Sequence, residues 1–414
     1  MTASSATGPS DALAAGREAL ARGAWGDARA AFSKAVAEAA ANAAGVAEAW
    51  EGIGLASYWL DDPARAVEAH ERAFAVYQAL RQPGRAARMA LWLADDHLTF
   101  LNAAAVANGW IERAERLLED APDAAAGVWL PIYRGHYVLQ VEFDAERAAG
   151  LAREGLARAR AVGAADAEVV ALALEGLALV FQGDAGAGMP RLDEASAAAV
   201  SRGLGDLNAV AWALCYLIQG CETSRDFHRA TEWCSRVLAF CERWGLGPVF
   251  TSCRTRYASV LTWQGQWASA ESQIQQLLGT APAPAQLSSG RRSALVRLGE
   301  VRRRQGRLDE AQTLFDQAGE HRLAILGRAT VALARDELDV AGDLAGRVLR
   351  LLPRDARAER ADALLIRIVA AARRGDVALV EDDLRELAET AARLATPPHQ
   401  IVDALKTKFP RGPS

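Results

Sequence analysis

The stretch ALVRLGEVRRRQGRLDEAQTLFDQA, residues 294–318, decides the fold of this chain. Two segments rich in helix-forming Leu, Arg, Glu and Ala lie on either side of Gly306. Their apolar residues recur at intervals of three and four, which predicts two short helices joined by a tight turn at the glycine. Small residues at Gly299 and Ala311 would let the backbones of these helices approach closely where they cross.

The same arrangement recurs along the whole chain. A small or turn residue is followed five positions later by alanine or another small residue, which we call the reference position. This position is occupied in ten copies by Ala28, Ala66, Ala114, Ala148, Gly188, Ala230, Ala270, Ala311, Ala341 and Val380. A period of about 40 residues is typical of helical repeats, whose units bury their apolar faces by stacking on one another. The longest interval, from Ala66 to Ala114, predicts an insertion near residues 100–108 (FLNAAAVAN).

Composition places the chain among globular proteins, with 51% hydrophobic and 24% charged residues. A formal net charge of -5 does not favour nucleic-acid binding. The N-terminal MTASSATGPSDALAAG lacks the basic start and apolar core of a signal peptide. The longest apolar run, Val169–Phe181, is too short to span a bilayer and contains Glu175. We therefore expect a cytoplasmic protein that makes no membrane contact.

All five cysteines lie in one segment, from Cys215 to Cys253. An odd number of clustered cysteines fits a reducing compartment. In the repeat register, Cys221 and Cys234 fall where the two helices of a pair pack together, and Cys241 shares the face of Cys234. Free cysteine is a good small core residue, so we predict that these cysteines pack in the core.

Alternatives that use cysteine chemistry are disfavoured. A metal site made of Cys221, His228 and Cys234 would need His228 to face the core, but the register places it on the outer side of its helix. No histidine is placed to activate Cys215 or Cys253 as a nucleophile. The sequence also lacks a phosphate loop, a nucleophile elbow, a zinc helix and a dinucleotide fingerprint. We therefore predict no catalytic residue, no metal ligand and no cofactor.

Two charged features have ordinary interpretations. Acidic pairs occur at residues 61–62, 95–96 and 382–383, but none has a second acidic pair one helical turn away to share magnesium ions with it. The pair before Pro63 is better explained as a helix N-cap. Seven arginines occur between Arg291 and Arg307, and acidic residues interrupt or follow them. This stretch predicts a solvated helix face rather than a nucleic-acid patch.

The repeat resembles the tetratricopeptide repeat. Residues 49–77 match its pattern through Trp50, Gly54 and Ala66, and residues 294–318 match it through Gly299 and Phe315. The resemblance implies an all-α, right-handed solenoid of about ten helix-turn-helix repeats over residues 11–396. A disordered tail (1–10) would precede the solenoid, and a divergent helix or tail (397–414) would follow it.

Segments 92–118, 225–271 and 298–329 are similar to the tetratricopeptide region of large LuxR-type bacterial transcriptional regulators. These regulators often carry a C-terminal helix-turn-helix domain, for which residues 397–414 offer no counterpart. The resemblance implies a non-enzymatic interaction or ligand-sensing module of a bacterial signalling system. It would bind a protein or peptide partner, with a small-molecule effector as a further option, and would not bind nucleic acid directly. The alternative is a small-molecule-responsive regulator that acts on DNA through a partner or a missing DNA-binding domain. No oligomeric state is predicted.

In the tetratricopeptide fold, residues 18, 15, 11 and 8 positions before the reference position lie on the inner surface. These offsets predict a partner-binding groove lined by Tyr58, Tyr133, Tyr137, Gln140, Trp212, Cys215, Gln219, Glu222, Thr255, Ser259, Thr262, Glu300 and Arg303. Aromatic residues flanked by hydrogen-bonding groups are typical of binding hot spots. In the alternative arrangement, long helices close the superhelix and bury the same aromatic residues as additional core.

Overall fold

The computed structural model describes residues 9–38, 43–201, 206–244, 250–279, 289–354 and 356–394. These ranges form α-helices and one short π-helix, with no strand among them. The elements are α1 (Pro9–Ala21), α2 (Trp25–Glu38), α3 (Ala43–Trp59), α4 (Pro63–Ala79), α5 (Pro83–Thr99), α6 (Ala104–Asp120), α7 (Ala124–Tyr137), η1 (Val138–Glu142), α8 (Ala145–Val162), α9 (Ala165–Phe181), α10 (Ala185–Ser201), α11 (Leu207–Ser224), α12 (Phe227–Trp244), α13 (Phe250–Trp263), α14 (Trp267–Gly279), α15 (Ser289–Arg304), α16 (Leu308–Gln317), α17 (Arg322–Ala334), α18 (Leu338–Leu351), α19 (Arg357–Arg374) and α20 (Val377–Leu394).

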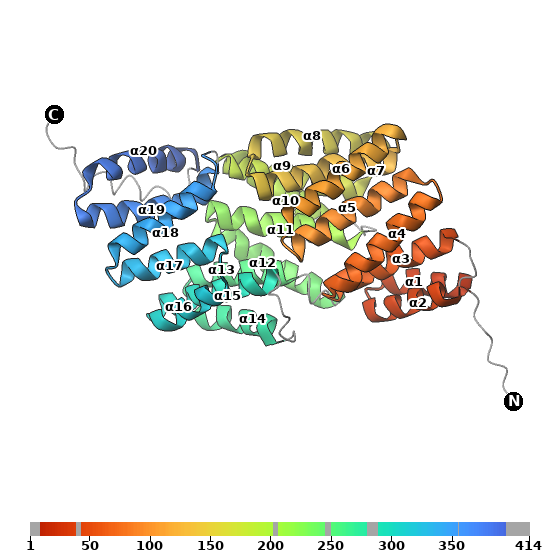
Figure 1. Ribbon diagram of the computed structural model, residues 1–414, viewed down its shortest axis with the longest axis horizontal. Coiled ribbons are helices and arrows are strands. Elements are labelled where there is room, and N and C mark those ends of the chain that lie inside the picture. Colours follow the sequence, from red (N-terminus) through yellow and green to blue (C-terminus); the bar gives the residue numbers. More distant parts are fainter. Residues whose placement is uncertain are drawn as a thin grey trace.

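The helices pack pairwise in sequence, and the pairs stack into a curved array (Figure 1). The pairs α1–α2 and α19–α20 lie at opposite ends of the long axis of the molecule (Figure 1). The first helix of a pair also contacts the first helix of the next pair, as in α9–α11 and α13–α15. We call these odd-numbered helices the inner helices. The all-α fold of ten helical pairs is therefore confirmed. None of the described helices has the length and apolarity needed to cross a membrane.

The reference position is the fourth residue of the second helix in nine of the ten pairs. The exception is Ala114, which lies seven residues further into α6 than the equivalent Ala107. Ala107 is 41 residues from Ala66 and 41 from Ala148. The insertion predicted near residues 100–108 is therefore wrong. The second alanine, one heptad later on the same helical face, had shifted the register.

Each pair turns through a left-handed residue five positions before the corrected reference position. Glycine occupies this turn in five pairs, at Gly23, Gly183, Gly265, Gly306 and Gly375. The other five turns use Asp61, Asn102, Phe143, Arg225 and Asp336. Asp and Asn tolerate this conformation, whereas a bulky side chain such as phenylalanine is strained there. The turns at Phe143 and Arg225 therefore need stabilisation from elsewhere in the fold.

Glycines on the inner helices receive large side chains from the second helices. The ring of Phe315 on α16 fits between Gly299 on α15 and Gly327 on α17. A Cβ atom at Gly299 would lie 2.6 Å from this ring, and one at Gly327 would lie 2.4 Å from it. Phe32 fits in the same way against Gly52 on α3. This interlocking fixes the spacing between one pair and the next.

The core differs between the two halves of the array. One continuous hydrophobic cluster runs from Ala12 in α1 to Val260 in α13. From α13 to α20 the buried apolar residues form three smaller clusters instead. Two bulky turn residues of the first half contact residues of the second half. Phe143 packs against the core of α17–α20, and Arg225 donates a 2.8 Å hydrogen bond to Asp362 on α19.

Candidate binding site on the inner helices

The predicted groove residues all lie on inner helices or on η1, as the repeat register requires. Eight of them are buried: Tyr58, Tyr133, Tyr137, Trp212, Gln219, Thr255, Ser259 and Thr262. Five are partly exposed: Gln140, Cys215, Glu222, Glu300 and Arg303. In this structure the aromatic members therefore lie inside the array, as the alternative arrangement describes, and the charged members border its accessible inner surface. Their role in binding stays a prediction.

Aromatic side chains of α7 and α11 meet in the interior. The ring centroids of Tyr133 and Trp212 are 5.0 Å apart, and the imidazole of His136 lies 4.8 Å from the Trp212 ring. His136 Nδ1 is 2.7 Å from the hydroxyl oxygen of Tyr216. Burial lowers the pKa of His136 to about 4, so this imidazole is neutral near pH 7.

Two other predicted residues occupy different surroundings. Tyr58 makes edge contacts with Trp92 and Phe100, at centroid distances of 5.5 and 5.1 Å. Tyr137 belongs to a separate small cluster that includes Ile111 of α6. Tyr58 therefore joins the interior aromatic group, whereas Tyr137 lies apart from it.

Sequence reasoning missed three interior residues of α5. The guanidinium of Arg88 lies 4.2 Å from the Trp129 ring, 5.6 Å from Tyr133 and 5.7 Å from Trp92. Asp95 is buried on the same helix, two turns after Arg88. The turn at Asn102 was the signal that could have found one of them, Trp92. With Ala107 as the reference position, an offset of 15 selects Trp92.

Asp95 lies in a crowded acidic setting. Burial and the neighbouring Asp96 raise its pKa to about 7, although hydrogen bonds with Tyr58 and Thr99 oppose the shift. Asp96 Oδ2 is 2.6 Å from Nδ1 of His70, and both side chains are buried. His70 occupies the α4 position that corresponds to Phe32 and Phe315, and its ring stacks on Trp92 at 5.4 Å. In this repeat, the hydrogen-bonded pair of His70 and Asp96 thus takes the place of the phenylalanine ring that other repeats insert between helices.

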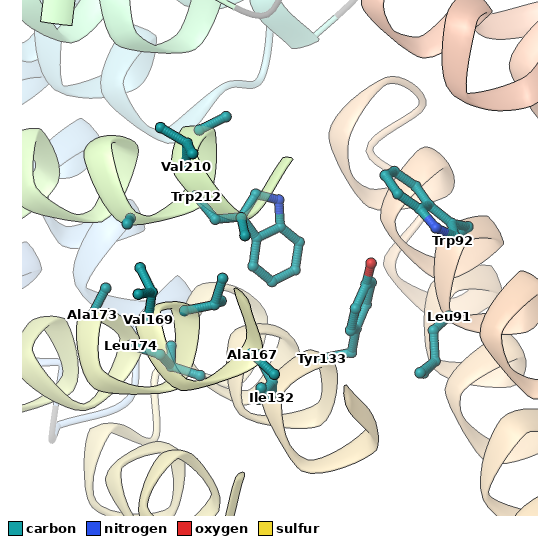
Figure 2. Close-up of a cluster of buried hydrophobic side chains, with 14 of the residues drawn as sticks. Leu91, Trp92, Ile132, Tyr133, Ala167, Val169, Ala173, Leu174, Val210 and Trp212 are labelled. Atoms are coloured by element: carbon teal, nitrogen blue, oxygen red, sulfur yellow. The ribbon is translucent and has the colours of Figure 1, made fainter. Parts of the chain in front are cut away.

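Four buried polar atoms around this aromatic group have no hydrogen-bond partner in the described part of the chain. They are Arg88 Nη1, Asp95 Oδ2, Tyr133 Oη and Asn208 Oδ1. Figure 2 shows the Tyr133 ring between the indoles of Trp212 and Trp92, with its hydroxyl directed to the space between them. Buried polar groups in folded proteins are normally paired, so this concentration is unusual.

A second group of polar residues joins three successive inner helices. Glu222 on α11 accepts hydrogen bonds from Arg256 on α13, at 2.9 Å, and from Arg297 on α15, at 2.5 Å. Arg297 also donates to the hydroxyl of Ser259 at 3.1 Å. Burial raises the pKa of Glu222, but the two arginines outweigh it and hold that pKa below its ordinary value. Further along α15, Glu300 accepts from Arg303 at 2.7 Å. We call these six residues the arginine cluster.

The arginine stretch of α15 is not the solvated face that its sequence suggested. The side chain of Arg302 is only 9% exposed and pairs with Glu271. Those of Arg297, Arg303 and Arg304 are between 17% and 23% exposed, and each has a carboxylate partner. The prediction rested on the alternation of charge along one helix. It did not account for Glu222 and Glu271, which other helices bring to Arg297 and Arg302.

The cysteine prediction is confirmed for two residues. Cys221 and Cys234 are buried in the core, and burial raises the pKa of both thiols, that of Cys234 to about 12. Cys215 is disulfide-bonded, which differs from the expected set of free thiols. The side chains of Cys241 and Cys253 lie outside the described residues. His228 is 88% exposed and faces away from the core, 3.7 Å from Glu232.

No protein-family model matches this chain, and no curated protein matches it. Two solved structures show a distant likeness. One is a signal-transduction ATPase with numerous domains from Pyrococcus horikoshii that has a tetratricopeptide repeat sensor. It has 15% identity and a TM-score of 0.42, and the match covers 73% of this chain and 45% of that one, less than half of its length. The other is yeast Tom70, with 12% identity and a TM-score of 0.41, covering 97% of this chain and 96% of Tom70.

Proposed function

We propose that this protein is a non-catalytic binding module of a bacterial signalling or transcription-regulatory system. Its inner helices would bind a segment of a partner protein. The observation that carries the proposal is the arginine cluster, in which α11, α13 and α15 present partly exposed charged groups side by side. Arginine is enriched in binding hot spots because its planar guanidinium can bond a carboxylate through two N–H groups.

The energetic state of these arginines supports an exchange of partners. Burial lowers the pKa of Arg256, although Glu222 opposes the shift, because a desolvated cation lacks full compensation. One carboxylate is shared between Arg256 and Arg297. An acidic side chain of a partner would supply the second carboxylate. The predicted peptide partner would therefore carry acidic residues where it crosses α13 and α15.

Site-specific photo-crosslinking in cells would test the proposal. A photoreactive residue at position 303, on the inner helix α15, should give a discrete crosslinked species. The matched control is position 340 on α18, where Val340 is 48% exposed on a second helix. The double variant Arg256→Ala with Arg297→Ala should lose the crosslink at position 303 while its circular dichroism stays unchanged. Equal crosslinking from both positions, or a crosslink that survives the double variant, would count against the proposal.

A second candidate function follows from the resemblance to LuxR-type regulators. In that case the partner is a DNA-binding protein, and this chain controls it in response to a small molecule. A mobility shift of promoter DNA that requires both proteins and weakens with salt would favour this candidate. DNA binding by the partner that is unchanged by this chain would argue against it.

A further inference from the structure

The inner helices α3, α5, α7 and α11 enclose a group of aromatic rings that we call the ring cluster. Its members are Tyr58, Trp92, Trp129, Tyr133, Trp212 and Tyr216. Contacts between neighbouring rings run from 5.0 to 6.3 Å between centroids. The ring cluster shares no residue with the arginine cluster, although both use α11: Trp212 and Tyr216 belong to the ring cluster and Glu222 to the arginine cluster. Flat apolar walls with a few convergent polar groups are the usual composition of a small-molecule site.

The polar groups of the ring cluster have unmade hydrogen bonds. Asp95, Tyr133 and Asn208 are each at least nine-tenths buried, and each has an oxygen atom with no partner in the described ranges. Arg88 adds an unpartnered N–H group from the same side of α5 as Asp95. Leaving such a group unpaired in the interior is unfavourable, so four of them in one place favour a bound molecule that satisfies them.

The charge of that molecule follows from Arg88. This guanidinium already fills the cationic position over Trp92, Trp129 and Tyr133, so a second cation would be repelled. The nearest acid, Asp206, is 3.7 Å from Arg88, too far for a hydrogen bond. Asp206 instead accepts a 2.8 Å hydrogen bond from the backbone N–H of Asn208. The charge of Asp206 therefore compensates the Arg88 guanidinium without a hydrogen bond, and the Nη1 group of Arg88 remains able to donate one to a ligand.

We propose that the ring cluster binds a small planar aromatic carboxylate. The carboxylate accepts hydrogen bonds from Arg88, the ring lies against Trp92 and Trp212, and a polar group at the far edge bonds the Tyr133 hydroxyl. This site does not depend on the proposed partner-binding function. The raised pKa of Asp95 keeps part of that carboxyl population protonated at neutral pH, which limits its repulsion of an anion.

Isothermal titration calorimetry with three matched probes tests the proposal on the full chain. Indole-3-acetate, indole-3-acetamide and tryptamine share one ring and carry negative, neutral and positive charge. We expect the acid to bind more tightly than the amide, and the amine to bind most weakly. Arg88→Gln should weaken the acid by about tenfold or more, to the level of the amide, because a hydrogen bond to a charged group is lost.

Two further variants separate a ligand-binding role from a structural one. Tyr133→Phe removes a hydroxyl that has no partner in the free protein. It should keep or raise the melting temperature while weakening the acid. The matched control is Arg134→Gln, one residue away on α7. Arg134 pairs with Glu112 and Glu115 at 2.7 and 2.6 Å and does not face the ring cluster. Its loss should leave probe affinity unchanged.

Several results would overturn the proposal. One is tighter binding of tryptamine than of indole-3-acetate, which would make this a cation site. Another is unchanged affinity for the acid in a folded Arg88→Gln variant. A third is the absence of binding by all three probes at millimolar concentration, which would leave ordered water as the partner of the four atoms. Failure of the photo-crosslinking experiment would not affect these outcomes.

Discussion

The two halves of the array use one repeat geometry to build different interiors. From α1 to α12 the inner helices bring large aromatic side chains together inside one continuous core. From α13 to α20 the core is divided, and inner positions carry arginines paired with carboxylates, such as Arg297 with Glu222. Small residues at helix crossings set the spacing of the backbone in both halves. The residues at the inner positions then decide whether the interior holds apolar rings or charged pairs.

Asp95 provides the test with the largest expected effect, because it is a titrating acid inside the aromatic half. Its pKa of about 7 in the folded protein exceeds the ordinary value of 3.8. The folded state therefore binds more protons than the unfolded state between about pH 4 and pH 7, and its free energy of unfolding falls as pH rises through that window. Asp95→Asn removes this term, so the variant should gain as much as a few kcal/mol over wild type at pH 8.

His136 acts in the opposite direction over an overlapping range. Its lowered pKa means that stability is lost as pH falls from about 6.5 to about 4, where the unfolded chain gains a proton first. Only the difference between wild type and Asp95→Asn isolates the Asp95 effect. Hydrogen exchange of the α5 amides measures the Asp95 effect in the aromatic half. The α19 amides provide the comparison in the other half. A pH-independent difference in α5 protection would contradict the assignment.

The glycines that contact phenylalanine rings of the second helices allow a test of the helix spacing that both halves share. Gly299→Leu would drive a side chain into the Phe315 ring and should cost roughly 1–3 kcal/mol in the free energy of unfolding. Gly109→Leu is the matched control, because a Cβ atom there meets nothing within 4 Å. Denaturant unfolding of both variants gives the comparison. Equal effects at the two positions would mean that the interlocking does not set the repeat spacing.

The sequence predicts the geometry that these glycines create but not the contents of the interior. Ten copies of one internal pattern were enough to predict the helical pairs and to place Trp212 and Glu222 on inner helices. Offsets along one chain cannot show which side chains meet across the array, and Tyr133 is buried beside Trp212 of α11. One repeated alanine, Ala114, also shifted the register and hid Trp92. The partners of Arg302 could not be predicted either, because they lie on other helices.

Phe143 tests the contact between the halves. Its left-handed turn, with φ of 58°, is strained for phenylalanine, while its ring packs against the core of α17–α20. Phe143→Gly relieves the strain, worth about 1–2 kcal/mol, but removes a larger apolar contact. We expect a net loss of about 1 kcal/mol, seen as faster hydrogen exchange in α17 and α19 and little change in α3. Faster exchange throughout the chain would show instead that the turn supports its own pair alone.

Arg225 gives the smallest expected effect and sharpens the comparison with Phe143. It adopts the equivalent left-handed turn, with φ of 59°, and reaches the C-terminal half through Asp362 and the Trp263 ring, 4.3 Å from its guanidinium. Asp362 is 56% exposed, so solvent screens this ion pair and its contribution is at most about 1 kcal/mol. Glycine at the turn gains a similar amount by relieving strain. Arg225→Gly should therefore leave the melting temperature nearly unchanged. It should also remove the part of the salt dependence of the melting temperature that comes from the Arg225–Asp362 ion pair. A large loss of stability would mean that the polar contact of Arg225 contributes more than the packing of Phe143 to the association of the two halves.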